Sequence, residues 1–254
     1  MTPFIVTDVY DLPRLAEATA LPGSWAVGGA LTLAFSFLAR WMRGVTNLGA
    51  LVGAVSCFVL FMGGGLGAFA ALITVFALAW ITTRFGYQRK QKLGTAERRE
   101  GRKASQVLAN LAVATVCAAF SLLSPHSRPF FLLAMAAALS EAAADTVSSE
   151  LGQAFGEKAR LVTTWSLVPA GTDGAVSLAG TAAGMVAAGI VSSVCVLGGL
   201  LPRHWLPLSA GAAILGMVAD SFLGAWLERR HLVNNDSVNF LSTLIAALAA
   251  FWLA

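Results

Sequence analysis

Residues 130–147 read FFLLAMAAALSEAAADTV, and this stretch decides the fold class. Its apolar residues run continuously, and the run is close to the length of about 20 residues that an α-helix needs to cross the hydrocarbon core of a bilayer. A membrane β-barrel would instead show segments of about ten residues with alternating polarity. The stretch therefore predicts a transmembrane helix, and this helix carries two acids, Glu141 and Asp145.

The rest of the chain has the same character. Of its 254 residues, 57% are hydrophobic and only 12% are charged, a composition that cannot give a soluble domain a solvated surface. Because only helices satisfy their backbone hydrogen bonds in lipid over such lengths, we expect an all-α, polytopic membrane protein built as a bundle of about eight transmembrane helices. The predicted spans are 24–41, 48–64, 66–83, 105–123, 130–147, 176–199, 208–227 and 239–254.

The basic residues predict how these spans are oriented. When eight spans are threaded alternately through the bilayer, 14 of the 17 Lys and Arg residues fall on one side, and Arg14, Arg128 and Arg203 fall on the other. By the positive-inside rule the basic side is cytoplasmic, so we expect a multi-pass protein of the inner (plasma) membrane with both termini extracytoplasmic. The basic excess then reflects topology and attraction to anionic lipid headgroups, and no nucleic-acid partner is required.

The expected organisation is one transmembrane domain over 24–254, preceded by an extracytoplasmic segment, 1–23. That first segment lacks the basic start and the cleavage site of a signal peptide. Two connections are long enough to carry chemistry, 84–104 and 151–175, and both are expected on the cytoplasmic side. A site for a polar ligand is therefore expected at the cytoplasmic end of the helices.

Acidic residues inside apolar spans indicate where such a site lies, because an ionisable group in hydrocarbon costs several kcal/mol and usually persists for function. Glu141 and Asp145 are four residues apart and share a helix face with Ser149, and Glu150 follows at the cytoplasmic end. Asp220 lies in another span, roughly 10 Å from its cytoplasmic end at the helical rise. The approach of these acids to one side favours a shared site, and simple pairing with loop Lys or Arg residues is the alternative.

A glycine-rich loop, LVPAGTDGAVS at 167–177, leads into the span that follows. Its glycines and hydroxyl groups belong to Gly171, Thr172, Gly174 and Ser177. Flexible glycines and capping hydroxyls at the start of a helix suit an anion such as phosphate. A second polar cluster, Asn234–Asn239, precedes the last span on the same side, and ordinary helix capping explains that cluster equally well.

These features form an ordered set of motifs. They are TNLGA at 46–50, GRKASQVLAN at 101–110, ADTVSSELG at 144–152, VPAGTDGAVS at 168–177, DSFLG at 220–224 and NNDSVN at 234–239. Over residues 24–254 the set resembles the integral membrane proteins once catalogued as domain of unknown function 92, a family that includes plant phytyl-phosphate kinase and transmembrane protein 19. Each motif is weak singly, but together they are specific. The chain departs from the family pattern at Glu141 and Asp173.

The resemblance implies that a nucleoside triphosphate, CTP or another, donates a phosphoryl group to a prenyl (phytyl-like) monophosphate whose tail lies among the apolar helices. It implies that Asp145, Glu150 and Asp220 form the catalytic centre and bind Mg²⁺. The expected substrate and phosphate contacts are Arg102, Gln106, Asn110, Ser149, Gly171, Thr172, Gly174, Ser177, Asn234, Asn235 and Asn239. The alternative function is a transporter or lipid flippase whose buried acids, Glu141 above all, carry protons or a coupling ion.

The topology gives a first prediction. In a variant without the three native cysteines, a single cysteine placed in the 84–104 or 151–175 connection should react with a membrane-impermeant maleimide only from the cytoplasmic side, because the basic residues gather there. Intact cells and inverted vesicles provide the two readouts. A cysteine at Ser127 is the control and should react only from outside. Labelling of either long connection in intact cells would contradict the predicted orientation.

Overall fold

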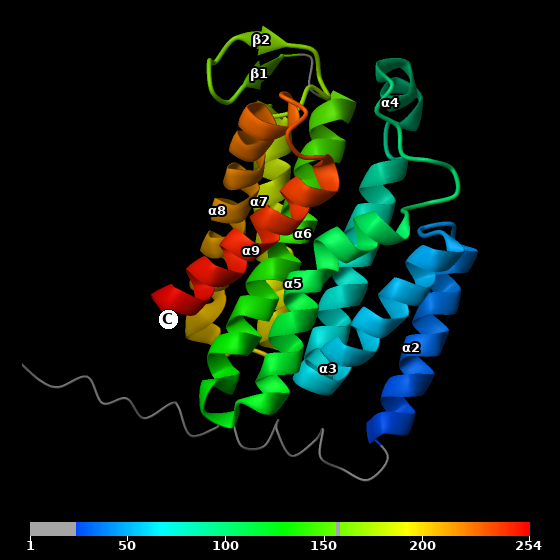
Figure 1. Ribbon diagram of the computed structural model, residues 1–254, viewed down its shortest axis with the longest axis vertical. Helices are drawn as coiled ribbons and strands as arrows, with labels where there is room; N and C mark the ends of the chain where they lie inside the picture. The colour runs from blue at the N-terminus through cyan, green and yellow to red at the C-terminus, as the bar shows by residue number, and fades with distance from the viewer. Residues whose placement is uncertain (1–23, 156–157) are drawn as a thin grey trace, which may run out of the picture.

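The computed structural model describes residues 24–155 and 158–254, and in these residues the chain is a bundle of helices with broadly aligned axes (Figure 1). The long helices are α2 (Ser24–Trp41), α3 (Asn47–Arg84), α5 (Ala104–Leu123), α6 (Arg128–Phe155), α7 (Leu178–Leu197), α8 (Leu206–Leu223) and α9 (Asn235–Leu253). Six of these helical stretches are long and apolar enough to cross a membrane. The prediction of an all-α, multi-pass membrane fold is confirmed, whereas the expected segment 1–23 lies outside the described residues.

The shorter elements connect these helices. They are α4 (Tyr87–Leu93), the 3₁₀ turns η2 (Pro125–Ser127) and η3 (Arg203–Trp205), the π-helical turn η4 (Gly224–Glu228), and the strands β1 (Ala159–Leu161), β2 (Leu167–Val168) and β3 (Ala175–Val176). The strands form a small antiparallel sheet in the order β2-β1-β3, with Arg160 opposite both Leu167 and Val176. The sheet and α4 lie at the same end of the bundle (Figure 1). The two long connections therefore share one end of the molecule.

Helix α3 is folded back on itself at Gly65, whose φ of 63° and ψ of −152° are not helical. The indole N–H of Trp80 donates to the carbonyl oxygen of Met42 at 3.1 Å, and the Arg84 guanidinium donates to the same oxygen at 2.7 Å. Because Met42 precedes the start of α3, these bonds place the end of the helix beside its beginning. The two arms of α3 are consequently antiparallel.

This fold-back bears on the number of spans. The arms of α3 correspond to the predicted spans 48–64 and 66–83, so all eight predicted spans lie in helical segments when the arms and α2 are counted separately. Helix α2 is not among the six stretches that are long and apolar enough to cross a membrane. Eight is therefore an approximate count of spans.

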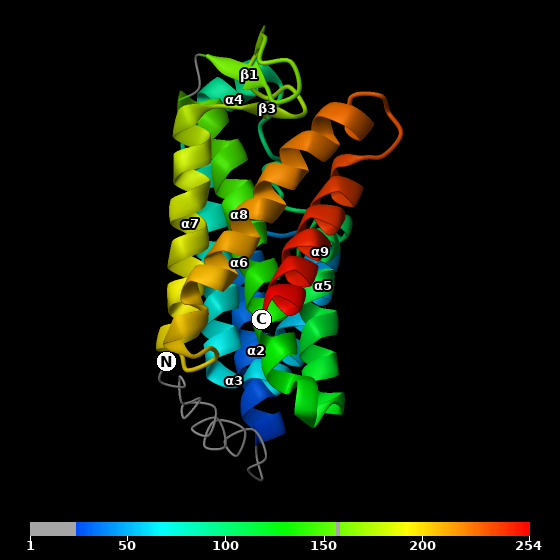
Figure 2. The ribbon, with the colours of Figure 1, turned by 90° about the vertical axis from the view of Figure 1, so that its left-hand side faces the viewer.

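Helix α6 is the centre of the bundle. It packs against α3, α5, α7, α8 and α9, and Figure 2 shows it between α7 and α9. Small residues let its neighbours approach closely. A Cβ atom added to Gly180 or Gly184 of α7 would come within 2.6 Å or 2.8 Å of the carbonyl oxygens of Ser148 and Ala144, respectively. This close packing fixes the acid-bearing face of α6 relative to α7.

The fold-back of α3 gives the second prediction. A Cβ atom on Gly63 would lie 2.6 Å from the carbonyl oxygen of Ala118 in α5, so Gly63→Ala should push the two helices apart. We expect it to lower the free energy of unfolding by about 1–3 kcal/mol, as overpacking usually does. Gly189→Ala on α7 is the matched control, because an added Cβ there meets nothing within 4 Å. Denaturant unfolding in detergent measures both, and equal stabilities would contradict the packing described here.

Candidate active site at one end of the bundle

A polar cavity of about 370 Å³ opens at the end of the bundle that carries α4 and the sheet. Its walls come from the starts of α5 and α9, the ends of α6 and α8, and the loop between β2 and α7. The predicted site residues that line it are Asp145, Glu150, Asp220, Arg102, Gln106, Asn110, Ser149, Gly171, Thr172, Gly174, Ser177, Asn235 and Asn239. Residues from five separated segments of the sequence thus surround one space.

Asn234 is the predicted site residue that lies outside this cavity. Its side-chain oxygen accepts hydrogen bonds from the backbone N–H and the hydroxyl of Ser237, both at 2.9 Å, and so caps α9. It lines an adjoining, more open cavity together with Asp173 and Glu228. The structure thus shows Asn234 as a helix cap, and its contact with a substrate stays a prediction.

Asp145 and Asp220 are the acids at the base of the polar cavity. They come from α6 and α8, and their carboxyl groups lie close to each other. The guanidinium of Arg102 is the nearby positive charge, and it also donates to the Thr146 hydroxyl at 3.3 Å. Among the described residues, Oδ2 of Asp220 is buried without a hydrogen-bond partner. A buried charge of this kind is usually paired or bound to a cation, so the pair fits a metal ion.

Glu150 departs from the expected role of a metal ligand. Lys90 of α4 is completely buried and forms an ion pair with Oε2 of Glu150, while the Thr83 hydroxyl donates to Oε1 at 2.9 Å. The ammonium of Lys90 also donates to the carbonyl oxygens of Thr82 and Thr83, at 2.8 Å and 2.7 Å. Both carboxylate oxygens of Glu150 are thus engaged in fastening α4 to α3 and α6. The structure thus shows Glu150 paired with a loop lysine, and its role as a metal ligand stays a prediction.

The three expected ligands therefore do not form a set. In the part of the chain that the structure describes, no group of three His, Cys, Asp or Glu side chains could hold a metal ion as they stand. A site with two carboxylates is nevertheless sufficient for Mg²⁺, which usually keeps several waters and takes its other ligands from substrate phosphates. Asp145 and Asp220 are the residues that fit this description.

The glycine-rich loop covers the ends of these helices. Gly171 and Gly174 have φ values of +87° and +72°, which glycine adopts most readily. An added Cβ on Gly174 would lie 2.4 Å from the backbone nitrogen of Ala225, so the loop touches the π-helical turn η4 directly. The Thr172 hydroxyl donates to the Pro169 carbonyl oxygen at 2.8 Å and therefore shapes the turn. Such π-helical turns are frequent at functional sites.

Other residues line the cavity that the sequence analysis did not select, among them Thr95, Glu97, Thr146, Ser148, Gln153 and Glu228. Helical periodicity could have found Gln153, which lies four residues after Ser149 on the face that carries Asp145. Its Oε1 atom is buried without a hydrogen-bond partner among the described residues. For Glu97, in contrast, no sequence pattern in its charged loop predicts a place in the site. In the structure its side chain accepts a hydrogen bond from Gln106 at 3.0 Å.

Glu141 lies deeper in the bundle and does not line the polar cavity. Its side chain is buried, packs where Gly216 of α8 leaves space, and has one oxygen without a hydrogen-bond partner in the described structure. The residue is one turn below Asp145 on α6. The acids therefore extend from the cavity toward the middle of the bundle.

Fold and site together define a multi-pass helical membrane protein with a polar cavity at one end of its bundle. The chain belongs to the family described as integral membrane protein DUF92, whose family model matches residues 30–247. No solved structure shows a significant match to this one.

Three relatives extend this assignment. The chain is 32% identical over 197 residues to the chloroplastic protein VTE6 of Arabidopsis thaliana, with 73% of this chain and 58% of that protein covered, so it spans less than two thirds of the plant protein. It is 31% identical to an uncharacterised membrane protein of Methanocaldococcus jannaschii, covering 81% and 84% of the two chains. It is 33% identical to an uncharacterised membrane protein of Synechocystis, covering 73% of each.

The buried ion pair gives the third prediction. Lys90→Met leaves the carboxylate of Glu150 without its cation, so it should lower the free energy of unfolding by about 3 kcal/mol. The double variant Lys90→Met/Glu150→Gln should lose less than Lys90→Met alone, because no uncompensated charge remains. Lys92→Met, on the exposed side of the same helix, is the control and should change stability by less than about 0.5 kcal/mol. Additive losses in the double variant would contradict the coupling of Lys90 to Glu150.

Proposed function

We propose that this protein is a membrane-embedded phosphotransferase that moves a phosphoryl group from a nucleoside triphosphate to a prenyl monophosphate. The observation that carries the proposal is the one-sidedness of the polar cavity. Every helix that lines the cavity contributes residues from the same end of the bundle. Glu141, which lies one turn deeper than Asp145, is not among the lining residues. A site of this kind meets soluble nucleotide from one side and a lipid phosphate at the membrane surface.

The residues at the cavity match what phosphoryl transfer requires, which is mainly positioning and neutralisation of charge. Asp145 and Asp220 would hold Mg²⁺, and the bound ion would neutralise charge on the phosphate oxygens. Arg102 presents a planar guanidinium, which suits phosphate. The loop with Gly171 and Gly174 brings its backbone close to the end of α8. Together these groups would hold the nucleoside triphosphate and the prenyl monophosphate side by side, although the two anions repel each other.

The reaction balances without a redox partner. An oxygen of the prenyl monophosphate attacks the γ-phosphorus and forms a new P–O bond, while the bond from that phosphorus to the β-phosphate oxygen breaks. The bonding electrons leave with the nucleoside diphosphate, and the product is the prenyl diphosphate. When the acceptor is a dianion, no proton has to be removed, so the lack of a histidine beside Asp145 and Asp220 in the described cavity is no obstacle.

The second candidate function is transport, and Glu141 is the observation that favours it. A buried carboxyl group with an unpaired oxygen in the middle of a membrane bundle is typical of proton or ion relays. The site of an alternating-access transporter lies near the middle of the bundle. The polar cavity lies at one end of the bundle and does not include Glu141, which favours phosphoryl transfer.

The fourth prediction is the activity itself. Purified protein with Mg²⁺ should convert geranylgeranyl or phytyl monophosphate to the diphosphate with CTP or another nucleoside triphosphate. Asp145→Asn and Asp220→Asn should each lower turnover at least tenfold, about 1.4 kcal/mol of transition-state stabilisation, because each removes a negative charge from the proposed metal site. Asp173→Ala should have a smaller effect. Glu100 is an exposed acid that lines neither cavity, so the control variant Glu100→Gln should turn over as fast as the wild type.

Folded wild-type protein that transfers no phosphoryl group from any common nucleoside triphosphate to either lipid would reject the proposal. Solute counterflow in proteoliposomes that is lost in Glu141→Gln would then establish the transport function instead. Both assays use the same purified chain, so the two functions can be compared directly.

A further inference from the structure

A second cavity of about 340 Å³ lies beside the polar one, and its character is apolar. It is enclosed by α2, both arms of α3 and the start of α5. Its apolar lining includes Phe35, Val45, Leu72, Val75, Phe76 and Leu111. The volume falls within the range of about 300–1,000 Å³ that is usual for small-molecule sites. A cavity with this lining would take a hydrocarbon chain.

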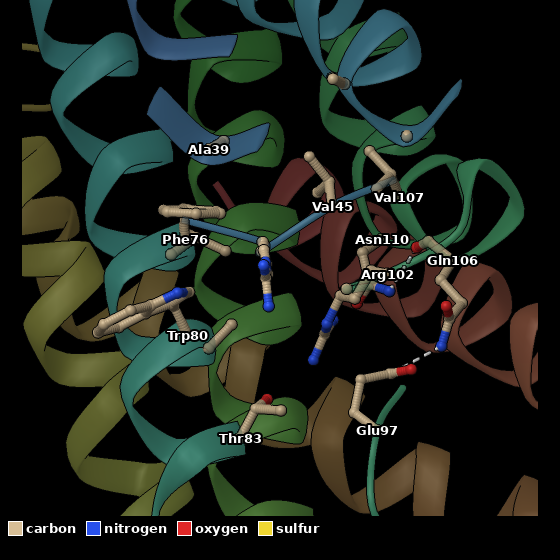
Figure 3. Close-up of a pocket in the computed structure, with 18 of the residues that line it drawn as sticks. Ala39, Val45, Phe76, Trp80, Thr83, Glu97, Arg102, Gln106, Val107 and Asn110 are labelled. Atoms are coloured by element: carbon tan, nitrogen blue, oxygen red, sulfur yellow. Dashed lines mark hydrogen bonds between the residues drawn. The ribbon is translucent and has the colours of Figure 1, made fainter. Parts of the chain in front are cut away.

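The two cavities share a wall. Glu97, Arg102, Gln106 and Asn110 line both of them. Figure 3 draws Arg102 between the aromatic residues Phe76 and Trp80 on one side and the Glu97–Gln106 pair on the other. A single molecule with an apolar chain in one cavity and an anionic group in the other would therefore contact Arg102 at the junction.

Arg102 is held firmly in this position. Its backbone N–H donates to the carbonyl oxygen of Gly44 and its own carbonyl oxygen accepts from the N–H of Thr46, both at 3.0 Å. Gly101, with a φ of +89°, packs so closely that an added Cβ would lie 2.5 Å from the carbonyl carbon of Gly44. The segment before α5 is thus fixed to the connection between α2 and α3. The guanidinium can mark a defined boundary between the two cavities.

Charge at the mouth of the apolar cavity indicates the headgroup it would accept. Four further arginines line the cavity, and all four are exposed: Arg43, Arg84, Arg98 and Arg99. Glu97 is the only acid among its described lining residues, and its Oε2 atom accepts the hydrogen bond from Gln106. An apolar cavity with a cationic mouth is complementary to an amphiphile whose head is anionic.

The aromatic pair Phe35–Phe76 lines the apolar cavity and does not line the polar one. The two rings meet edge to face, with centroids 5.4 Å apart, and the Phe76 ring also packs against Gly44. From Thr83 to Leu72, which both line the cavity, α3 rises about 16 Å. The two rings therefore reduce the space available to a chain that lies along this stretch of α3.

We propose that the apolar cavity binds the isoprenoid chain of the acceptor, with its phosphate at Arg102, and that Phe35 and Phe76 limit the chain length that fits. This inference rests on the proposed function, because the lipid is the acceptor of that reaction. It adds the place of the chain and the residues that select its length.

Binding can be measured apart from turnover. Geranylgeranyl monophosphate is titrated into the full chain in nanodiscs, and the affinity for the nucleotide is measured separately. Gly53→Leu places a side chain in the apolar cavity, where an added Cβ has room because its nearest neighbour, Cγ1 of Val107, is 3.8 Å away. This variant should bind the lipid at least tenfold more weakly and bind the nucleotide as the wild type does. Gly189→Leu is the control and should bind both normally, because its Cβ meets nothing within 4 Å.

A second variant tests the limit on chain length. Phe76→Ala enlarges the cavity, so the ratio of affinities for a longer over a shorter prenyl monophosphate should rise at least threefold over the wild type. If Phe76→Ala does not fold, the Gly53→Leu comparison decides alone. Unchanged lipid affinity in Gly53→Leu with intact turnover would overturn this inference and leave the proposed function standing. Lipid binding that is sensitive to Gly53→Leu, in a protein without turnover, would support the cavity and reject the phosphotransferase.

Two further outcomes also overturn the inference. One is wild-type protein that does not bind prenyl monophosphate at all. The other is displacement of geranylgeranyl monophosphate by phosphatidic acid at equal concentration, which would assign the cavity to bulk membrane phospholipid. Inorganic phosphate should not displace the lipid at comparable concentrations, because it lacks the chain that fills the apolar cavity.

Discussion

A carboxylate among apolar helices needs a positive partner, and the site of this protein depends on how each acid meets that need. Glu150 meets it with Lys90, whose ammonium group is fully buried. Asp145 lies near Arg102, whereas Asp220 keeps a buried oxygen without a partner in the described structure. Two acids share one guanidinium at the base of the cavity. This shortage of positive charge is the physical reason to propose a cation between the two acids and the phosphates of the proposed substrates.

The same requirement connects the fold to the site. The ion pair of Lys90 with Glu150 fastens α4 over the end of α6, and the chain then continues through Glu97 to Arg102. Close contacts at glycines, such as Gly174 on Ala225 and Gly180 on Ser148, bring the loop and α7 against the acid-bearing helices. Arg102 then lies where a polar and an apolar cavity meet. Buried charge, loop position and the junction of the two cavities are therefore parts of one arrangement.

Much of this could be predicted from the sequence, because lipid imposes strict demands on composition and length. Continuous apolar runs predicted the helices, and the four-residue spacing of Glu141 and Asp145 predicted acids on one helix face. The partner of Glu150 could not be predicted, since nothing periodic connects it to Lys90. The predicted spans 48–64 and 66–83 already divided the chain at Gly65, where α3 folds back. The apolar cavity depends on how side chains of four helical segments fit together, which no single segment reveals.

The central claim is that lipid and nucleotide meet at Arg102, with the acids of α6 and α8 beneath the phosphates. A cryo-electron microscopy structure with geranylgeranyl monophosphate, a non-hydrolysable nucleotide analogue and Mg²⁺ tests it most directly. The account predicts both sets of phosphates in the polar cavity next to Arg102, metal density between them and Asp145 and Asp220, and the prenyl chain in the apolar cavity. Lipid density on the outer surface of the bundle, or a nucleotide away from these acids, would contradict it.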